Sequence, residues 1–178
     1  TTAHRYQSLI NDTNCHELDT RKTTPGLRYL EKEAVLIGGG MNHRIGLFDM
    51  ILLKDNHVDF AGGITAALTR AKAYCEEKGK DLRIEIETRS EDEIREALAT
   101  NIPDRIMLDN FSPERTKVAV EIIRTWEKEN GKYIEIESSG GITIDTLHDY
   151  AVTGVDFVSV GALTHSVKSL DMSFKALK

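Results

Sequence analysis

Short runs rich in β-branched residues alternate with longer helical patterns along most of the chain. The runs lie roughly 20–30 residues apart, the spacing expected when helices connect successive parallel strands. The seven predicted strands cover residues 16–19, 34–38, 50–54, 83–87, 105–108, 133–137 and 157–160. None of them is a central run broken by proline, so all seven are expected in one sheet.

Three of the helical patterns have clear start or stop signals. Ser90 is followed by Glu93 at capping-box spacing, ahead of an apolar stripe. Ser112 and Pro113 supply an N-cap and a first-turn proline for a helix that should end near Gly131. Its inward stripe is predicted to be Val118, Ala119, Ile122, Ile123 and Trp126. Another helix is predicted over residues 64–77.

Repeated strand–helix units predict a parallel sheet. Seven near-equal units favour a closed or nearly closed seven-stranded α/β barrel of the TIM type over an open doubly wound sheet. The first predicted strand is not followed by a GxGxxG turn, which also disfavours a dinucleotide-binding sheet.

Composition narrows the class of protein. The 178 residues are predicted to form one barrel domain, and the net charge of −6 argues against a nucleic-acid partner. There is no apolar run long enough to cross a membrane. Cys15 and Cys75 lack metal-type spacing, which is typical of free thiols in a cytoplasmic protein. The chain begins at Thr1 and reads as part of a longer protein.

Cations gather just past three predicted strands, although the protein as a whole is acidic. Arg21 and Lys22 lie among hydroxyl side chains after the first strand, and His43 and Arg44 follow a triple glycine after the second. Lys54 ends the third. Barrel active sites lie on these loops, and such side chains bind carboxylates and phosphates. Solvated basic loops and a flexible glycine turn are the alternative interpretations.

Carboxylates lie at the same ends of the strands. Glu85 and Glu87 alternate with two isoleucines, so both glutamates should point into the barrel, where a cation must pair with them. Lys54 at the end of an apolar strand needs an anion or a carboxylate partner. A salt bridge with Asp19 or Glu87 is the structural alternative, and it is compatible with a functional role. Asp109 closes the fifth strand, and carboxylates there suit ribose hydroxyls or Mg²⁺.

The last two strands are followed by glycine-rich loops. One contains Ser139, Gly140 and Gly141, and the other contains Gly161 and His165. Backbone amides from these positions of a barrel form a phosphate cradle. We therefore expect a phosphorylated ligand here.

Six motifs in order resemble the quinolinate phosphoribosyltransferases, the carboxylating nicotinate-nucleotide pyrophosphorylases. The motifs are DTRKTTPGLR at 19–28, GGGMNHRIGLFD at 38–49, LLKDNH at 52–57, MLDN at 107–110, ESSGGIT at 137–143 and GVDFVSVGALTHS at 154–166. The resemblance extends from about residue 3 to residue 174. One departure is Ser138, where the family usually has alanine.

The resemblance implies a reaction. Quinolinate would attack phosphoribosyl pyrophosphate with Mg²⁺ present, giving nicotinate mononucleotide, pyrophosphate and CO₂ in de novo NAD synthesis. Substrate carboxylates and pyrophosphate would be bound by Arg21, Lys22, His43, Arg44 and Lys54. Glu87 and Asp109 would hold the ribose hydroxyls and the metal, with Lys54 in the catalytic set. The 5′-phosphate would be bound by Ser139, Gly140, Gly141, Gly161 and His165.

The resemblance also implies what this chain lacks. Family members carry an N-terminal α/β domain that reaches over the active site of a partner in a homodimer or larger assembly and donates an arginine. These 178 residues do not include that domain, so the chain alone is expected to be inactive.

Two other functions fit parts of the pattern. In a Schiff-base aldolase, Lys54 would be the nucleophile, although a neighbouring acid such as Glu87 would keep it charged. In a non-catalytic phosphate-binding barrel, the glycine loops would suffice, and the five cations and two acids at the mouth would be unnecessary.

Overall fold

The computed structural model describes residues 2–177. Its strands are β1 (His16–Leu18), β2 (Ile51–Leu53), β3 (Ile84–Thr88), β4 (Arg105–Asp109), β5 (Glu135–Ser139) and β6 (Phe157–Ser159). Its helices are α1 (Thr2–Ser8), α2 (Arg28–Ile37), α3 (Asp55–Ala61), α4 (Ile64–Lys78), α5 (Glu91–Ala99), α6 (Pro113–Asn130), α7 (Leu147–Ala151) and α8 (Ala162–His165). None of the helices described is both long and apolar enough to span a membrane.

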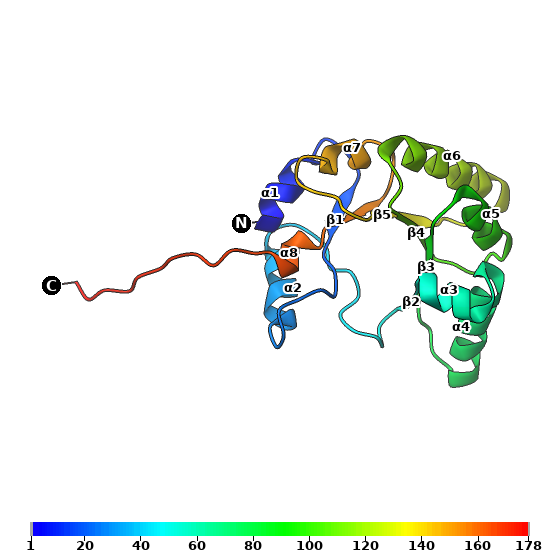
Figure 1. Ribbon diagram of the computed structural model, residues 1–178, viewed down its shortest axis with the longest axis horizontal. Coiled ribbons are helices and arrows are strands. Elements are labelled where there is room, and N and C mark those ends of the chain that lie inside the picture. Colours follow the sequence, from blue (N-terminus) through cyan, green and yellow to red (C-terminus); the bar gives the residue numbers. More distant parts are fainter. Residues whose placement is uncertain (1, 178) are drawn as a thin grey trace.

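The strands form one parallel sheet in the order β1-β6-β5-β4-β3-β2. Figure 1 shows the sheet curving, with the helices packed outside it. Because every pair is parallel, all strands end at the same rim. The α/β architecture with a parallel sheet is therefore confirmed, and its six strands are consistent with a TIM-like barrel.

The prediction of a strand over residues 34–38 is wrong, because residues 34–37 form the last turn of α2 and Gly38 is its C-cap. Val35 is buried, whereas Leu36 and Ile37 are 53% and 81% exposed. The apolar run resembles a buried strand, but the good helix formers before it extend one helix through it. A single parallel bridge between Leu18 and Met41 stands where the predicted second strand would pair with β1.

The predicted helix boundaries agree well with the structure. Ser90 Oγ accepts the N–H of Glu93 at 3.2 Å at the start of α5. Ser112 Oγ accepts the N–H of Arg115 at 3.3 Å at the start of α6, which ends before a left-handed Gly131. Local capping chemistry determines these ends, so the sequence alone was sufficient.

One residue of the predicted α6 stripe faces the wrong way. Val118 is 49% exposed, whereas Thr116 and Val120 are buried beside Ala119 and Ile123. The helix surface in contact with the sheet is centred nearer Ala119 than the apolar pattern suggested.

The two faces of the sheet have different chemistry. Ile84, Ile86 and Ile106 point outward into the apolar core beneath the helices. Glu85 and Arg105 alternate with them and point inward, where both are buried. The prediction that inward glutamates require a cation is confirmed by this pairing, and it places buried charges directly beneath the rim.

Residues 166–177, which follow α8, form neither helix nor strand and run away from the barrel (Figure 1). Leu170, Met172 and Phe174 are largely exposed in this segment.

Candidate active site

A cavity of about 850 Å³ opens at the carboxyl ends of the strands. Its lining comes from the loop after β1, the loop after α2 and the carboxyl ends of β2 to β6 with the loops that follow them. All twelve predicted site residues line it, namely Arg21, Lys22, His43, Arg44, Lys54, Glu87, Asp109, Ser139, Gly140, Gly141, Gly161 and His165. Residues up to 144 positions apart in the sequence (21 to 165) therefore meet in one cavity.

One wall of the cavity is cationic. The guanidinium of Arg44 is half-buried, and one of its nitrogens donates to the carbonyl of Met50 at 3.1 Å. Burial and the neighbouring Arg21 lower the pKa of Arg44. Among the residues described, the buried Nε of Arg21 has no hydrogen-bond partner. Two neighbouring guanidiniums that are incompletely compensated favour an anionic ligand between them.

Lys54 lies across the cavity at the end of β2. Its Nζ is 3.7 Å from Glu87 Oε2. Of the two expected carboxylate partners, Asp19 and Glu87, Lys54 therefore pairs with Glu87. Asp19 instead pairs with Lys32, whose Nζ lies 2.6 Å from Asp19 Oδ1. The structure thus leaves Lys54 half-exposed at the mouth, with a single carboxylate beside it.

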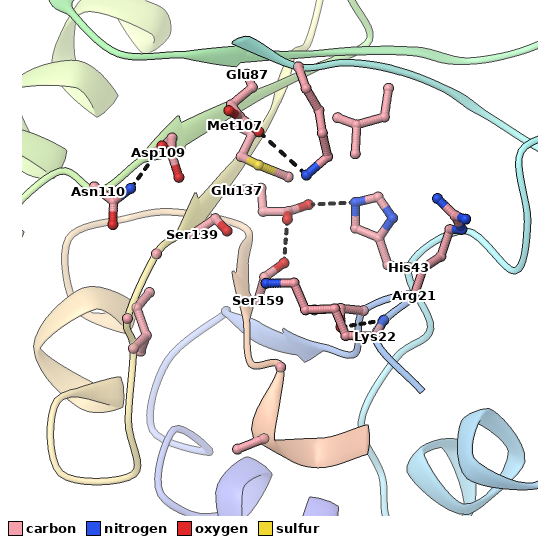
Figure 2. A pocket seen from close by; sticks show the side chains of 18 of the residues that line it. Arg21, Lys22, His43, Glu87, Met107, Asp109, Asn110, Glu137, Ser139 and Ser159 are labelled. Atoms are coloured by element: carbon pink, nitrogen blue, oxygen red, sulfur yellow. Dashed lines mark hydrogen bonds and ion pairs between the residues drawn. The ribbon is translucent and has the colours of Figure 1, made fainter. Parts of the chain in front are cut away.

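Glu87 and Asp109 stand at the ends of adjacent strands and face the same cavity (Figure 2). Burial raises the pKa of Glu87; Lys54 opposes that shift and Asp109 adds to it. The two carboxylates therefore repel each other and are not fully neutralised by lysine. A pair of hard oxygen donors in this state fits Mg²⁺, which uses one or two carboxylates and keeps several waters.

The floor of the cavity is a buried ion cluster, of which Figure 2 shows His43, Glu137 and Ser159. His43 Nε2 lies 3.0 Å from Glu85 Oε2 and 3.3 Å from Glu137 Oε2. Arg105 donates to Glu137 at 3.0 Å, and its guanidinium is 3.9 Å from Glu85. The hydroxyl of Ser159 also donates to Glu137. The cluster joins β3, β4, β5 and β6 through the barrel interior.

The pKa values of the ionisable side chains in this cluster are shifted in different directions. Burial opposes ionisation of Glu137, but His43, Arg105 and Ser159 outweigh it and lower its pKa to about 2. Burial and the charge of Glu137 raise the pKa of Glu85 to about 7. Burial alone would lower the pKa of His43, yet the two carboxylates raise it to about 9. The backbone N–H of Arg44 donates to His43 Nδ1 at 2.8 Å, so the proton that the two carboxylates hold is the one on Nε2.

The same three side chains are a candidate metal centre. Ligand atoms of His43, Glu85 and Glu137 lie within 4.8 Å of one another. However, the guanidinium of Arg105 already occupies the cationic position beside both glutamates. The group is therefore better described as an internal ion network than as a metal site.

The opposite wall is built from the two glycine loops. Gly140 and Gly141 have φ values of +107° and +64°, which glycine adopts without strain. A side chain at Gly161 would place its Cβ 2.7 Å from His165 Nε2. These loops expose backbone close to the cavity, as phosphate binding requires.

Sequence reasoning missed several residues here, above all Arg105, Glu137, Ser159 and Asn110. Glu137 carries the signal that revealed Glu85, since Glu135 and Glu137 alternate with isoleucines along their strand. Their pairing with Arg105 depends on the register between β4 and β5, which the sequence does not display.

The fold and cavity define a class of protein: a parallel α/β barrel with a cavity at the carboxyl ends of its strands, lined by cationic side chains, carboxylates and glycine loops. The family model described as "Quinolinate phosphoribosyl transferase, C-terminal domain" matches residues 1–175. The chain belongs to this family.

The names of similar proteins and of a similar solved structure agree with this family. The chain is 47% identical over 172 residues to the chloroplastic carboxylating nicotinate-nucleotide pyrophosphorylase of Arabidopsis thaliana, covering 89% of this chain and 47% of the relative. It is 45% identical over 164 residues to the probable Bacillus subtilis enzyme, covering 92% and 53%. A solved nicotinate-nucleotide pyrophosphorylase from Francisella tularensis superposes with a TM-score of 0.87 at 44% identity, covering 97% and 57%. The chain thus spans about half the length of these curated relatives.

Proposed function

We propose that this chain provides the barrel domain of an enzyme that transfers phosphoribose from phosphoribosyl pyrophosphate to quinolinate. The products are nicotinate mononucleotide, pyrophosphate and CO₂, a step of NAD synthesis. Support comes from the family membership and from the names of the relatives. The observation that carries the proposal is the division of one cavity into a cationic wall, an acidic rim and two glycine loops.

Each part of the cavity suits one part of the substrates. Arg21, Lys22, His43, Arg44 and Lys54 are assigned to the quinolinate carboxylates and the pyrophosphate. Ser139, Gly140, Gly141, Gly161 and His165 are assigned to the 5′-phosphate. Neutralising the two adjacent carboxylates lets the pyridine nitrogen approach the sugar, and fixed donors do this without reorganising during the reaction.

Glu87 and Asp109 are assigned to the ribose hydroxyls and to Mg²⁺. The metal, when bound, would neutralise the charge that develops on the departing pyrophosphate. The two carboxylates favour the positive charge that grows on the ribose carbon as its bond to pyrophosphate breaks. Lys54 adds a cation beside the same centre. The bond from the pyridine nitrogen then forms, CO₂ leaves, and the ring carbon takes up a proton.

We further infer that the active protein is a homodimer or larger assembly. Large apolar side chains are exposed on two helices, among them Leu30 and Ile37 on α2 and Phe60 on α3, the last 89% exposed. Exposed apolar surface of this kind favours a protein partner. The segment that the relatives have beyond this chain would contribute the remaining cover and an arginine. Both cysteines are free and buried, which suits a reducing compartment such as the cytoplasm.

The test is a coupled assay of the full-length protein with quinolinate, phosphoribosyl pyrophosphate and Mg²⁺. Equal release of pyrophosphate and CO₂, with formation of nicotinate mononucleotide, is expected. The 178-residue chain alone should show little turnover, because water would reach the open mouth and weaken the charge interactions. Absence of pyrophosphate release by the full-length protein would reject the proposal.

A Schiff-base reaction at Lys54 is the rival to exclude in the same experiment. The Nζ of Lys54 lies 3.7 Å from Glu87 Oε2, and the side chain is half-exposed, not enclosed in the apolar pocket that activates a lysine as a nucleophile. Borohydride with a carbonyl sugar phosphate should therefore trap no adduct.

A further inference from the structure

Asn110 follows Asp109, the last residue of β4, and lines the cavity beside it. Its side-chain amide donates a hydrogen bond to Asp109 Oδ2 at 2.8 Å (Figure 2). Its backbone N–H donates to the carbonyl of Ser139 at 2.8 Å. One residue therefore contacts both the acidic rim and the start of a glycine loop.

The backbone of Asn110 has a φ of +55°, in the left-handed region. Asparagine, aspartate and glycine tolerate that conformation better than other residues. Glycine has no side-chain donor, and aspartate would place a second negative charge against Asp109. Asparagine combines the required backbone conformation with a neutral donor for the neighbouring carboxylate.

Gly140 is fitted to Asn110 from the other side. A Cβ at position 140 would lie 2.9 Å from the backbone nitrogen of Asn110 and would also overlap the side-chain amide. The glycine loop can therefore approach the end of β4 only because position 140 has no side chain. The side-chain hydrogen bond from Asn110 to Asp109 and the close contact of Asn110 with Gly140 join these three residues into one packed unit.

We propose that Asn110 is a positioning residue that couples the Asp109 carboxylate to the Ser139–Gly140 loop. A single rigid unit then binds both ends of phosphoribosyl pyrophosphate, the end with the ribose hydroxyls and the metal and the end with the 5′-phosphate. The amide holds Oδ2 of Asp109 and leaves Oδ1 for the ligand. This inference rests on the proposed function, because it assigns both ends of the unit to that substrate.

Two asparagines of the same chain allow a matched test. Asn101 has a φ of +54° and precedes β4, whereas Asn110 follows it, so they lie at opposite ends of the barrel. Asn101→Gly and Asn110→Gly remove the same side chain from the same backbone conformation. Binding is measured by calorimetric titration of the full-length protein with phosphoribosyl pyrophosphate and Mg²⁺, and separately with quinolinate.

Asn110→Gly should weaken binding of phosphoribosyl pyrophosphate about tenfold, as expected for loss of a hydrogen bond to a charged group. It should also raise the Mg²⁺ concentration needed for half-maximal binding, while quinolinate binding stays unchanged. Asn101→Gly should change neither. A loss of both ligands in equal measure would indicate a general structural role and overturn the inference.

The two proposals fail in different ways. If the parent protein does not bind phosphoribosyl pyrophosphate, the proposed function is wrong. If the parent binds it and Asn110→Gly binds it equally well, Asn110 is not a positioning residue. Should Asn110→Gly melt well below Asn101→Gly, Asn110→Asp decides, because it keeps the side-chain size and the left-handed conformation. Normal binding by Asn110→Asp would then refute the coupling.

Discussion

Lys32 on α2 donates a hydrogen bond to Asp19 Oδ1 at 2.6 Å, and both side chains are almost fully buried. The same carboxylate oxygen accepts the backbone N–H of His43 at 2.8 Å, and Lys32 also donates to the carbonyl of His43 at 3.3 Å. The pair thus fastens the loop after α2 to the end of β1. It fixes the starting point of the segment that carries Arg44 into the cavity.

Replacing Lys32 with methionine should destabilise the protein by about 3 kcal/mol, because Asp19 would remain buried without its cation. The measurement is urea unfolding at pH 7, with Lys72→Met as the control, since Lys72 is more than half exposed. Burial already raises the pKa of Asp19 despite its partners, and loss of Lys32 raises it further. The stability loss should therefore shrink as the pH falls through the raised pKa of Asp19, and it should be smallest below about pH 4, where this carboxyl is protonated in the unfolded chain as well. An equal loss for both variants would contradict this account.

Glu17 on β1 should make the stability fall as the pH rises. It is fully buried, neither carboxylate oxygen has a hydrogen-bond partner among the residues described, and burial raises its pKa to about 8. The unfolded chain releases this proton near pH 4.3, whereas the folded protein keeps it to about pH 8. The free energy of unfolding therefore falls progressively as the pH rises between these two values, and it does not fall further above about pH 8 because of this group. Glu17→Gln cannot ionise, so it should gain on the parent by a few kcal/mol between pH 5 and about pH 8. The stability of both proteins is measured by urea unfolding at each pH. If the two plots of stability against pH run parallel, Glu17 is already ionised in the folded protein.

Arg44→Lys should weaken quinolinate binding about tenfold although the charge is retained. A guanidinium binds a carboxylate through two parallel hydrogen bonds, and lysine offers only a point charge. Calorimetric titration of the full-length protein with quinolinate measures the change. The exposed Arg70 on α4 provides the matched control, and Arg70→Lys should bind quinolinate normally. Equal dissociation constants for the two variants would remove Arg44 from the carboxylate site.

Gly161→Val should block phosphoribosyl pyrophosphate while leaving the fold intact. The φ of Gly161 is −61°, a conformation open to every residue, so valine adds no backbone strain. Its side chain would instead displace the ring of His165 and fill the space kept for the phosphate. Circular dichroism should match the parent, and calorimetry should detect no binding. A folded variant that binds the substrate normally would place the phosphate elsewhere.

Much of the fold could be predicted from local chemistry. The start of α5 at Ser90 and the end of α6 at Gly131 follow from capping and backbone preference, and the structure agrees with both. The run 34–38 shows where local reasoning fails. A short apolar run fits a buried strand or a buried helix equally well, and only its packing between the sheet and solvent distinguishes them.

The candidate site divides in the same way. The sequence by itself indicated which loops carry the cationic and glycine-rich candidates, because residues that end parallel strands share one rim. All twelve candidates line one cavity, although His43 and Arg44 follow α2 and not a strand. It did not determine which charges pair. The register between β4 and β5 brings Arg105 to Glu137. The packing of α2 against the sheet brings Lys32 to Asp19. Pairing energies depend on separation and burial, which are properties of the assembled tertiary structure.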